Sequence, residues 1–532
     1  MREQRRLRFC GWPLAGAIFA GWLIVIAVAF SRTTCTFLRA ESGWYELLAN
    51  SNAVTRADFL HGLFSHSYVG HYAPFAFLAE FELTRWIGPV ERFWHWRQLV
   101  ALSGVAVTLF ALVCAVARVH RVRWLHSVPA AVGITSLFVF QPLMRELLSW
   151  PFMVMQIGWI FCSLIAVTSL VQLVLDPGRE RWLWLAVGFG YGSMHLLGLG
   201  IITALSVWTI LLLLLAGIFA KKLPQFNRLR SRLFLALALL TILTLAHALC
   251  MSLLLPPGQL GANTPAPPPF SIASELGFVA SFCFAVLLAV VQPGAETSVG
   301  SYFVRALAPC GLLLLVGALL VAVQVTRRAW QRRSAARVTT ALLHVFAFTM
   351  FFGLLLLMAV RRSHDPAISN MTALLMGARY LVPASFAFAI SLVAVVVPMM
   401  HRARQLGAIF FIIVALAAVV TQCCFVPRVF RQLHPLSTIS HAKTWSAIVS
   451  MANECHASNV PIPNVPLGAL VQEFSTWDLQ LFEPFLRSQM HLPEEERLSF
   501  APWEKVQSSL PEYEHSAPSL RKVIERIKTP AH

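Results

Sequence analysis

Apolar runs of nearly bilayer-spanning length recur along most of the chain, separated by short polar stretches. A helix needs about 20 apolar residues to cross a hydrocarbon core roughly 30 Å thick, so each run predicts a membrane-spanning helix. The pattern predicts an all-α polytopic membrane protein with about eleven transmembrane helices, within a range of ten to twelve. The expected spans are residues 12–31, 98–117, 127–141, 152–175, 182–198, 199–219, 233–255, 304–326, 339–360, 379–400 and 406–425.

Three longer stretches interrupt or follow these spans. A long first outer loop covers 32–96, and its segments Tyr45–Leu48 and Phe75–Trp86 have the spacing of interfacial amphipathic helices. A second excursion covers 256–302. Residues 426–532 form a small C-terminal extramembrane domain after the transmembrane domain of residues 1–425.

The charge distribution orients these spans. Only 12% of residues are charged and 57% are hydrophobic, which excludes a soluble protein, where about 25% charge is usual. The net charge of +18 comes from basic residues in short loops, which is the positive-inside pattern and not a nucleic-acid footprint. It predicts a cytoplasmic N-terminus and a periplasmic C-terminal domain. Counting 276–291 as a further span would place Arg327 and Arg337 outside, so that stretch is expected to be re-entrant or interfacial.

The N-terminal arginines followed by an apolar run are typical of a signal peptide, but no clear small-residue cleavage site follows, which favours an uncleaved first span. Of the ten cysteines, none has a spacing that indicates a metal site. A divalent metal stays possible, but the sequence assigns no ligands to it.

The first outer loop contains, in this order, the motifs Ala40-Glu41-Ser42-Gly43-Trp44-Tyr45, Asn50-Ser51-Asn52-Ala53-Val54, Asp58-Phe59, Gly70-His71-Tyr72-Ala73-Pro74-Phe75, Trp86-Ile87-Gly88-Pro89 and Trp94-His95-Trp96. Over roughly residues 32–120 the chain thereby resembles the GT-C superfamily, the integral-membrane glycosyltransferases that use lipid-phosphate-linked sugars. Weaker similarities are Glu146 with Trp150, Gly192-Ser193-Met194-His195-Leu196 and Arg379-Tyr380-Leu381-Val382-Pro383. The chain departs from the family where Glu41 lacks a second acid beside it and where Tyr72-Ala73-Pro74 lacks an arginine.

The resemblance implies transfer of a sugar from a polyprenyl phosphate to a glycan, lipid or protein of the cell envelope. Such transfer needs a base for the acceptor hydroxyl and cations for the departing phosphate. The expected carboxylates are Glu41 and, as second choice, Asp58, which could instead cap a helix. The expected phosphate-binding residues, which could instead be interfacial side chains flanking spans, are Arg361, Arg362, His364, Arg379 and Tyr380.

Further candidates are Arg145 and Glu146, which could also pair with each other, together with His195 and Tyr72. The expected location is the bacterial inner membrane, with membrane lipids as partners and no nucleic acid. Two other classes stay open: a transporter or flippase of a lipid-linked intermediate, and a non-catalytic assembly protein on the same scaffold. A transporter would be expected to place polar residues in the middle of its spans.

Overall fold

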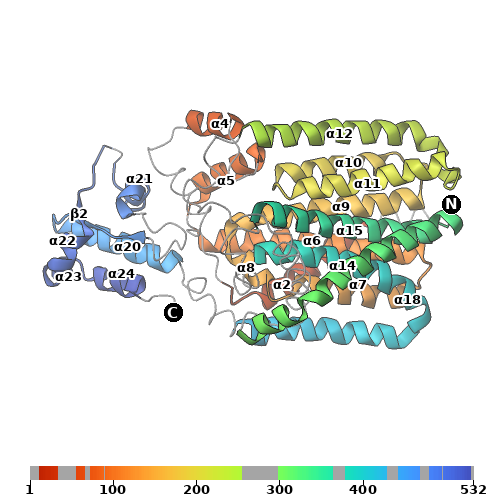
Figure 1. Cartoon of the computed structure of the whole chain (residues 1–532). Helices are drawn as coiled ribbons and strands as arrows, with labels where there is room; N and C mark the ends of the chain where they lie inside the picture. Colours follow the sequence, from red (N-terminus) through yellow and green to blue (C-terminus); the bar gives the residue numbers. More distant parts are fainter. Residues whose placement is uncertain are drawn as a thin grey trace.

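A computed structural model describes residues 11–33, 56–65, 72–88, 90–254, 298–332, 334–362, 378–427, 441–467, 478–493 and 495–528. These residues are almost entirely helical (Figure 1). The helices of the membrane part are α2 (Gly11–Ala29), α4 (Arg56–Ser65), α5 (Pro74–Ile87), α6 (Glu91–Val119), α7 (Trp124–Val139), α8 (Met144–Ser149), η1 (Pro151–Met153), α9 (Val154–Leu175), α10 (Arg181–Gly192), η2 (Ser193–His195), α11 (Gly200–Phe219), η3 (Pro224–Leu229), α12 (Arg230–Leu253), α14 (Ser298–Arg332), α15 (Ala335–Arg362), α18 (Ala378–Val420) and the π-helical η4 (Thr421–Phe425).

The chain is a multi-pass membrane protein. Among the described residues, seven helical stretches are long and apolar enough to cross a bilayer: Glu91–Val119, Pro151–Leu175, Gly200–Phe219, Pro224–Met251, Ala335–Leu356, Leu381–Met400 and Gln405–Phe425. Two shorter apolar helices, Leu14–Ala29 and Trp124–Val139, accompany them. The total of eleven spans stays a prediction, and the stretch 276–291 lies outside the described residues.

One expected span differs from the structure. The apolar run 182–198 forms only the twelve-residue helix α10, followed by the 3-10 turn η2. Twelve residues rise about 18 Å, which is too short to cross the hydrocarbon core. The helix stops at Gly192, and the hydroxyl of Ser193 then donates to the carbonyl oxygens of Gly190 and Gly200. Gly192 and Ser193 keep helical backbone angles, and the chain tightens there into the 3-10 turn η2. The start of α11 packs so closely on this turn that a side chain at Gly200 would clash with the Ser193 backbone.

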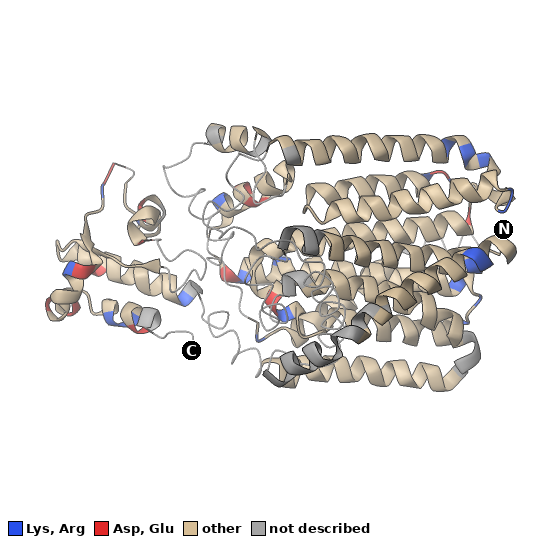
Figure 2. Cartoon of the chain, in the orientation of Figure 1, with Lys and Arg blue, Asp and Glu red and all other residues tan. Residues whose placement is uncertain are grey.

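The charged residues separate to the two ends of the helix bundle. Figure 2 shows Lys and Arg gathered at the end near the N-terminus and most of the acidic residues of the membrane part at the opposite end. We call the first the basic end; it includes the turns after α6, α9 and α11. We call the second the loop end; it includes α4, α5 and α8.

Inside the bundle, a few polar side chains join neighbouring helices. The Trp159 indole of α9 donates to the Thr203 hydroxyl of α11 at 2.9 Å, and Ser163 shares the same hydroxyl at 2.7 Å. The Trp208 indole of α11 donates to Thr241 of α12 at 2.9 Å. Each pairing satisfies polar atoms that lipid could not, so the contacts fix which helices are neighbours.

Residues beyond the bundle form a small segment whose hydrophobic core also includes Trp94 of α6, with Leu83, Ile87 and Phe93 packed against it. It comprises α20 (His441–Ala457), β1 (Ile462–Asn464), η7 (Leu479–Phe482), α21 (Glu483–Gln489), β2 (Phe500–Pro502), α22 (Trp503–Ser508), α23 (Leu510–Ser516) and α24 (Ser519–Lys528). The two strands pair in parallel, with Ile462 opposite Phe500. Glu454 of α20 accepts hydrogen bonds from the backbone N–H and hydroxyl of Ser519, at 2.9 and 2.6 Å, and so caps the start of α24.

Candidate functional site

The helix α5 lies in the first loop, where the sequence predicted an amphipathic helix over Phe75–Trp86. Its buried residues are Pro74, Phe77, Glu80, Phe81 and Thr84, which share one face because they follow the three-to-four-residue period of a helix. The predicted helix with one buried face is therefore present, and its place along the membrane interface stays a prediction. Glu80 is the charged exception in this face.

Glu80 is held by an arginine of the next helix. The Arg97 guanidinium of α6 lies 2.6 Å from the Glu80 carboxylate, and both side chains are largely buried. Burial raises the pKa of Glu80, and the attraction of Arg97 opposes that rise without cancelling it. A buried carboxylate of this kind depends on its partner, because an unpaired charge is costly away from water.

The same arginine reaches the break between α8 and α9. Arg97 also donates to the Pro151 carbonyl at 2.6 Å, and the Gln98 amide donates to the carbonyls of Trp150 and Pro151 at 2.7 and 2.8 Å. Pro151 has no N–H and the preceding Trp150 is extended, so the helix breaks here. The Trp150 and Pro151 carbonyls accept the backbone N–H groups of Met153 and Val154, and the side chains of Arg97 and Gln98 add further donors to them. Glu80, Arg97 and Gln98 therefore tie the first loop to this break.

The short helix α8 carries two further charged candidates. Arg145 and Glu146 are 2% and 7% exposed, which is rare for these residue types. The Arg145 guanidinium lies 6.0 Å from the centre of the Phe30 ring, at the end of α2. Arg145 thus stands where α2 and α8 meet at the loop end.

A third feature, which we call the histidine cluster, consists of Tyr72, Phe75, Tyr191, His195 and His247. The ring centres of His195 and His247 are 5.2 Å apart, and Tyr72 lies 5.8 Å from His247. Tyr191 and Phe75 lie 4.8 and 5.9 Å from His195. The cluster joins the start of α5 to the η2 turn and to α12.

Two nitrogen atoms of this cluster have no hydrogen-bond partner within the described part of the chain. They are Nδ1 of His195 and Nε2 of His247, and both atoms are buried. Burial, with the neighbouring Cys250 and Tyr191 as smaller causes, raises the pKa of Tyr72, so its phenol stays protonated at neutral pH. The cluster can therefore offer a phenol donor and two imidazole rings to a polar ligand.

The structure brings together some of the residues that the sequence singled out. Tyr72 and His195 meet through His247, which the sequence interpretation missed. The sequence could have indicated His247, because it is a histidine within the apolar run of α12 and an ionisable residue in a span is a candidate site residue. Arg97 was also missed, because it lies at the edge of a span where interfacial arginines are common.

The other predicted residues are only partly described. Asp58 lies in α4, Arg361 and Arg362 end α15, and Arg379 and Tyr380 begin α18, but their side chains are not described. Glu41, His364 and the segment Tyr45–Leu48 lie outside the described residues. The start of α18 belongs to the loop end, because Phe386 two turns later contacts Phe138 near the end of α7.

No three His, Cys, Asp or Glu side chains in the described residues lie close enough together to hold a metal ion. The chain matches no protein-family model, no curated protein and no solved structure. The site therefore has to be interpreted from its own geometry.

We predict that Arg97→Gln destabilises the protein by about 3 to 5 kcal/mol, because it leaves the Glu80 carboxylate buried without its partner. Glu80→Gln combined with Arg97→Gln should recover part of the loss, since two amides can bond to each other. Thermal unfolding of the purified protein in detergent measures both effects. The control is Arg92→Gln, which removes an exposed arginine of the same helix. If Arg97→Gln lowered the unfolding temperature no more than this control, the ion pair between Glu80 and Arg97 would not stabilise the fold.

Proposed function

We propose that this protein is a membrane glycosyltransferase of the GT-C type, located in the bacterial inner membrane with its loop end facing outward. It moves a sugar from a polyprenyl-phosphate donor to a glycan, lipid or protein of the cell envelope. The acceptor hydroxyl loses its proton to a carboxylate and attacks the anomeric carbon. The bond from that carbon to the phosphate oxygen breaks, and polyprenyl phosphate leaves with inverted configuration at the sugar.

The observation that carries this proposal is the gathering of buried polar groups at the loop end beside the first-loop helix. The Tyr72-Ala73-Pro74 element leads directly into the amphipathic helix α5, which is the order that the family resemblance implies. Arg97, Arg145, Glu146 and the polar members of the histidine cluster, Tyr72, Tyr191, His195 and His247, are buried or half-buried at the same end. A lipid-linked sugar presents its phosphate and anomeric carbon at this level of a bilayer, so a reaction there needs polar groups at the end of the bundle.

The position of His247 bears on the transporter alternative. It lies six residues before the end of α12, about 9 Å along the helix, and not at the middle of the span. The bonds inside the bundle, such as Trp159 to Thr203, satisfy hydroxyl groups and leave no charged path between the ends in the described helices. This arrangement favours chemistry at one face over passage through the bundle.

In this proposal Glu41 is the base and Asp58 is less important. Glu41 follows the first span by about ten residues, so it can turn back to the membrane surface where the donor sugar lies. Glu41→Gln keeps the shape and removes the charge, so we expect sugar transfer to fall about 100- to 10,000-fold with unchanged abundance in the membrane. Asp58→Asn is the matched comparison and should have a milder effect. Transfer should be measured with a labelled polyprenyl-phosphate sugar and membranes of each variant.

Two outcomes would redirect this assignment. Activity that survives Glu41→Gln but not Asp58→Asn would make Asp58 the base. Full cellular function in both variants would favour the transporter or assembly role.

The donor phosphate is assigned to Arg361, Arg362, His364, Arg379 and Tyr380. Arg361→Ala and Arg379→Ala should each raise the donor concentration for half-maximal transfer about tenfold or more, since a charge-assisted hydrogen bond contributes about 1.5 to 3 kcal/mol. Arg327→Ala, at the basic end, is the control and should leave donor use unchanged. Equal effects of all three substitutions would show that these arginines only anchor helix ends at the interface.

A further inference from the structure

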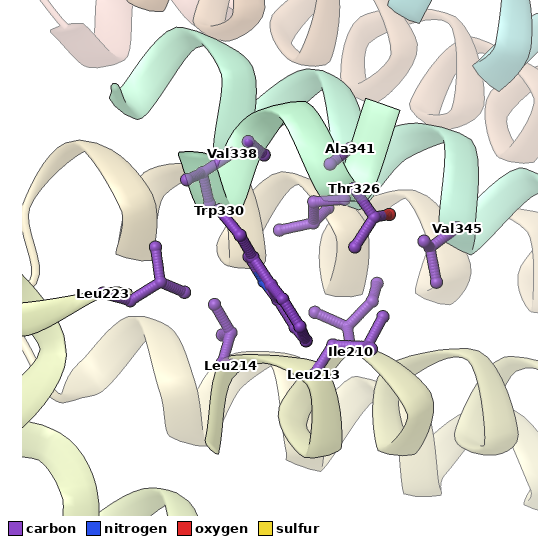
Figure 3. Close-up of a pocket in the computed structure, with 11 residues that line it drawn as sticks. Ile210, Leu213, Leu214, Leu223, Thr326, Trp330, Val338, Ala341 and Val345 are labelled. Carbon is purple, nitrogen blue, oxygen red and sulfur yellow. The ribbon is translucent and has the colours of Figure 1, made fainter. Parts of the chain in front are cut away.

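A second feature lies at the basic end, away from the proposed reaction site. Three helices, α11, α14 and α15, enclose a small pocket there (Figure 3). Figure 3 shows the Trp330 ring projecting from α14 between Leu214 and Leu223 on one side and the α15 residues on the other. Ile210 of α11 and Val345 of α15 also line the pocket.

The wall of this pocket is apolar. Its only hydroxyl, that of Thr326, donates to the Ala322 carbonyl of its own helix at 2.7 Å and is therefore satisfied. The cavity volume is about 40 Å³. That is far below the roughly 300 to 1,000 Å³ of a site that encloses a soluble ligand. The pocket therefore has room for a few methylene groups of a hydrocarbon chain, and the rest of such a chain would lie outside it.

The turn that ends α11 supplies Leu223, which lines one part of the pocket. The N–H groups of Lys222 and Leu223 both donate to the Gly217 carbonyl, at 2.8 and 3.1 Å, while Lys221 adopts a φ of 55°. This is a helix-ending turn in which the left-handed position usually belongs to glycine. A side chain at position 217 would meet the Leu223 side chain at 2.7 Å, so Gly217 makes room for Leu223 to close the pocket.

That turn places cations beside the pocket. Lys222 directly precedes Leu223, and Arg327 lies one turn before Trp330 on α14, where residues three apart share a face. The side chains of Lys221, Lys222, Arg327 and Arg328 are all exposed. None of the four pairs with a carboxylate in the part of the chain that the structure describes.

We propose that an anionic membrane phospholipid binds here, with one acyl chain in the pocket and its phosphate on Lys221, Lys222, Arg327 and Arg328. Ile210 lies nine residues, about 14 Å along the helix, from the end of α11 at Phe219, so the pocket extends from the basic end toward the membrane interior. Basic clusters beside grooves between membrane helices are suited to anionic headgroups. The acyl chain in the pocket fixes where the lipid binds, and the four cations favour a negatively charged headgroup.

The test uses the purified full-length protein in detergent. Native mass spectrometry measures the apparent dissociation constants of phosphatidylglycerol and phosphatidylcholine with the same acyl chains. We expect the anionic lipid to bind about tenfold or more tightly than the zwitterionic one. Dihexanoyl phosphatidylglycerol, whose short chains cannot extend from the headgroup as far as Ile210, should bind much more weakly than the long-chain form.

Two variants separate the headgroup from the chain. Replacing Lys221, Lys222, Arg327 and Arg328 by Gln should abolish the preference for the anionic lipid, while Val345→Phe should weaken both long-chain lipids by filling the pocket. The matched control replaces four other exposed cations of the basic end, Arg118, Arg123, Arg179 and Arg181, by Gln and should keep the preference.

Three results would overturn the proposal. They are equal binding of the two lipids by the unaltered protein, equal loss of preference in the two fourfold variants, and unchanged lipid binding in Val345→Phe. If Val345→Phe does not fold, the lipid preference of the two fourfold variants tests the proposal by itself.

Discussion

The hydrocarbon core of the membrane offers no hydrogen bonds, and this constraint decides most of what the chain does. Its backbone has to be helical wherever it crosses. Some polar side chains inside bond from helix to helix, as Trp159 does to Thr203, and many hydroxyls bond to carbonyls of their own helix. Charges are driven to the two ends of the bundle, as Figure 2 shows. Departures from this rule are costly, so the places where charged or titratable groups are buried carry most of the information about function.

Those departures concentrate at the loop end. The Glu80 and Arg97 pair joins the first-loop helix to the break at Trp150 and Pro151, and it thereby holds α5 over the ends of the spans. Because α10 is short, His195 after it lies beside His247, which in turn contacts Tyr72 just before the start of α5. The opposite end is different in kind: its cations are exposed, and the pocket beside them is apolar. One end is suited to chemistry on a polar group and the other to holding a lipid.

The sequence predicted the class of fold and several of these positions, because a span depends on local composition. The runs 199–219 and 152–175 correspond closely to α11 and to the stretch Pro151–Leu175. Tyr72, Arg145 and His195 were candidates because polar groups beside apolar runs stand out. The pairing of Glu80 with Arg97, and of His195 with His247, joins residues 17 and 52 positions apart, and no periodicity reports such contacts. The length of 182–198 was overestimated because hydropathy does not register that the helix gives way to a 3-10 turn at Ser193, before α11 begins at Gly200.

The central claim is that the loop end, with its buried polar groups, faces outward while the basic end faces the cytoplasm. The most direct measurement introduces single cysteines by Trp86→Cys, at a 77% exposed position of α5, and by Arg123→Cys, at the turn after α6, in a chain whose native cysteines are replaced. Each is treated with a membrane-impermeant maleimide. The account predicts that position 86 reacts in intact cells with a permeable outer membrane and that position 123 reacts only after the inner membrane is opened. Labelling of position 123 in intact cells, with position 86 protected, would contradict it.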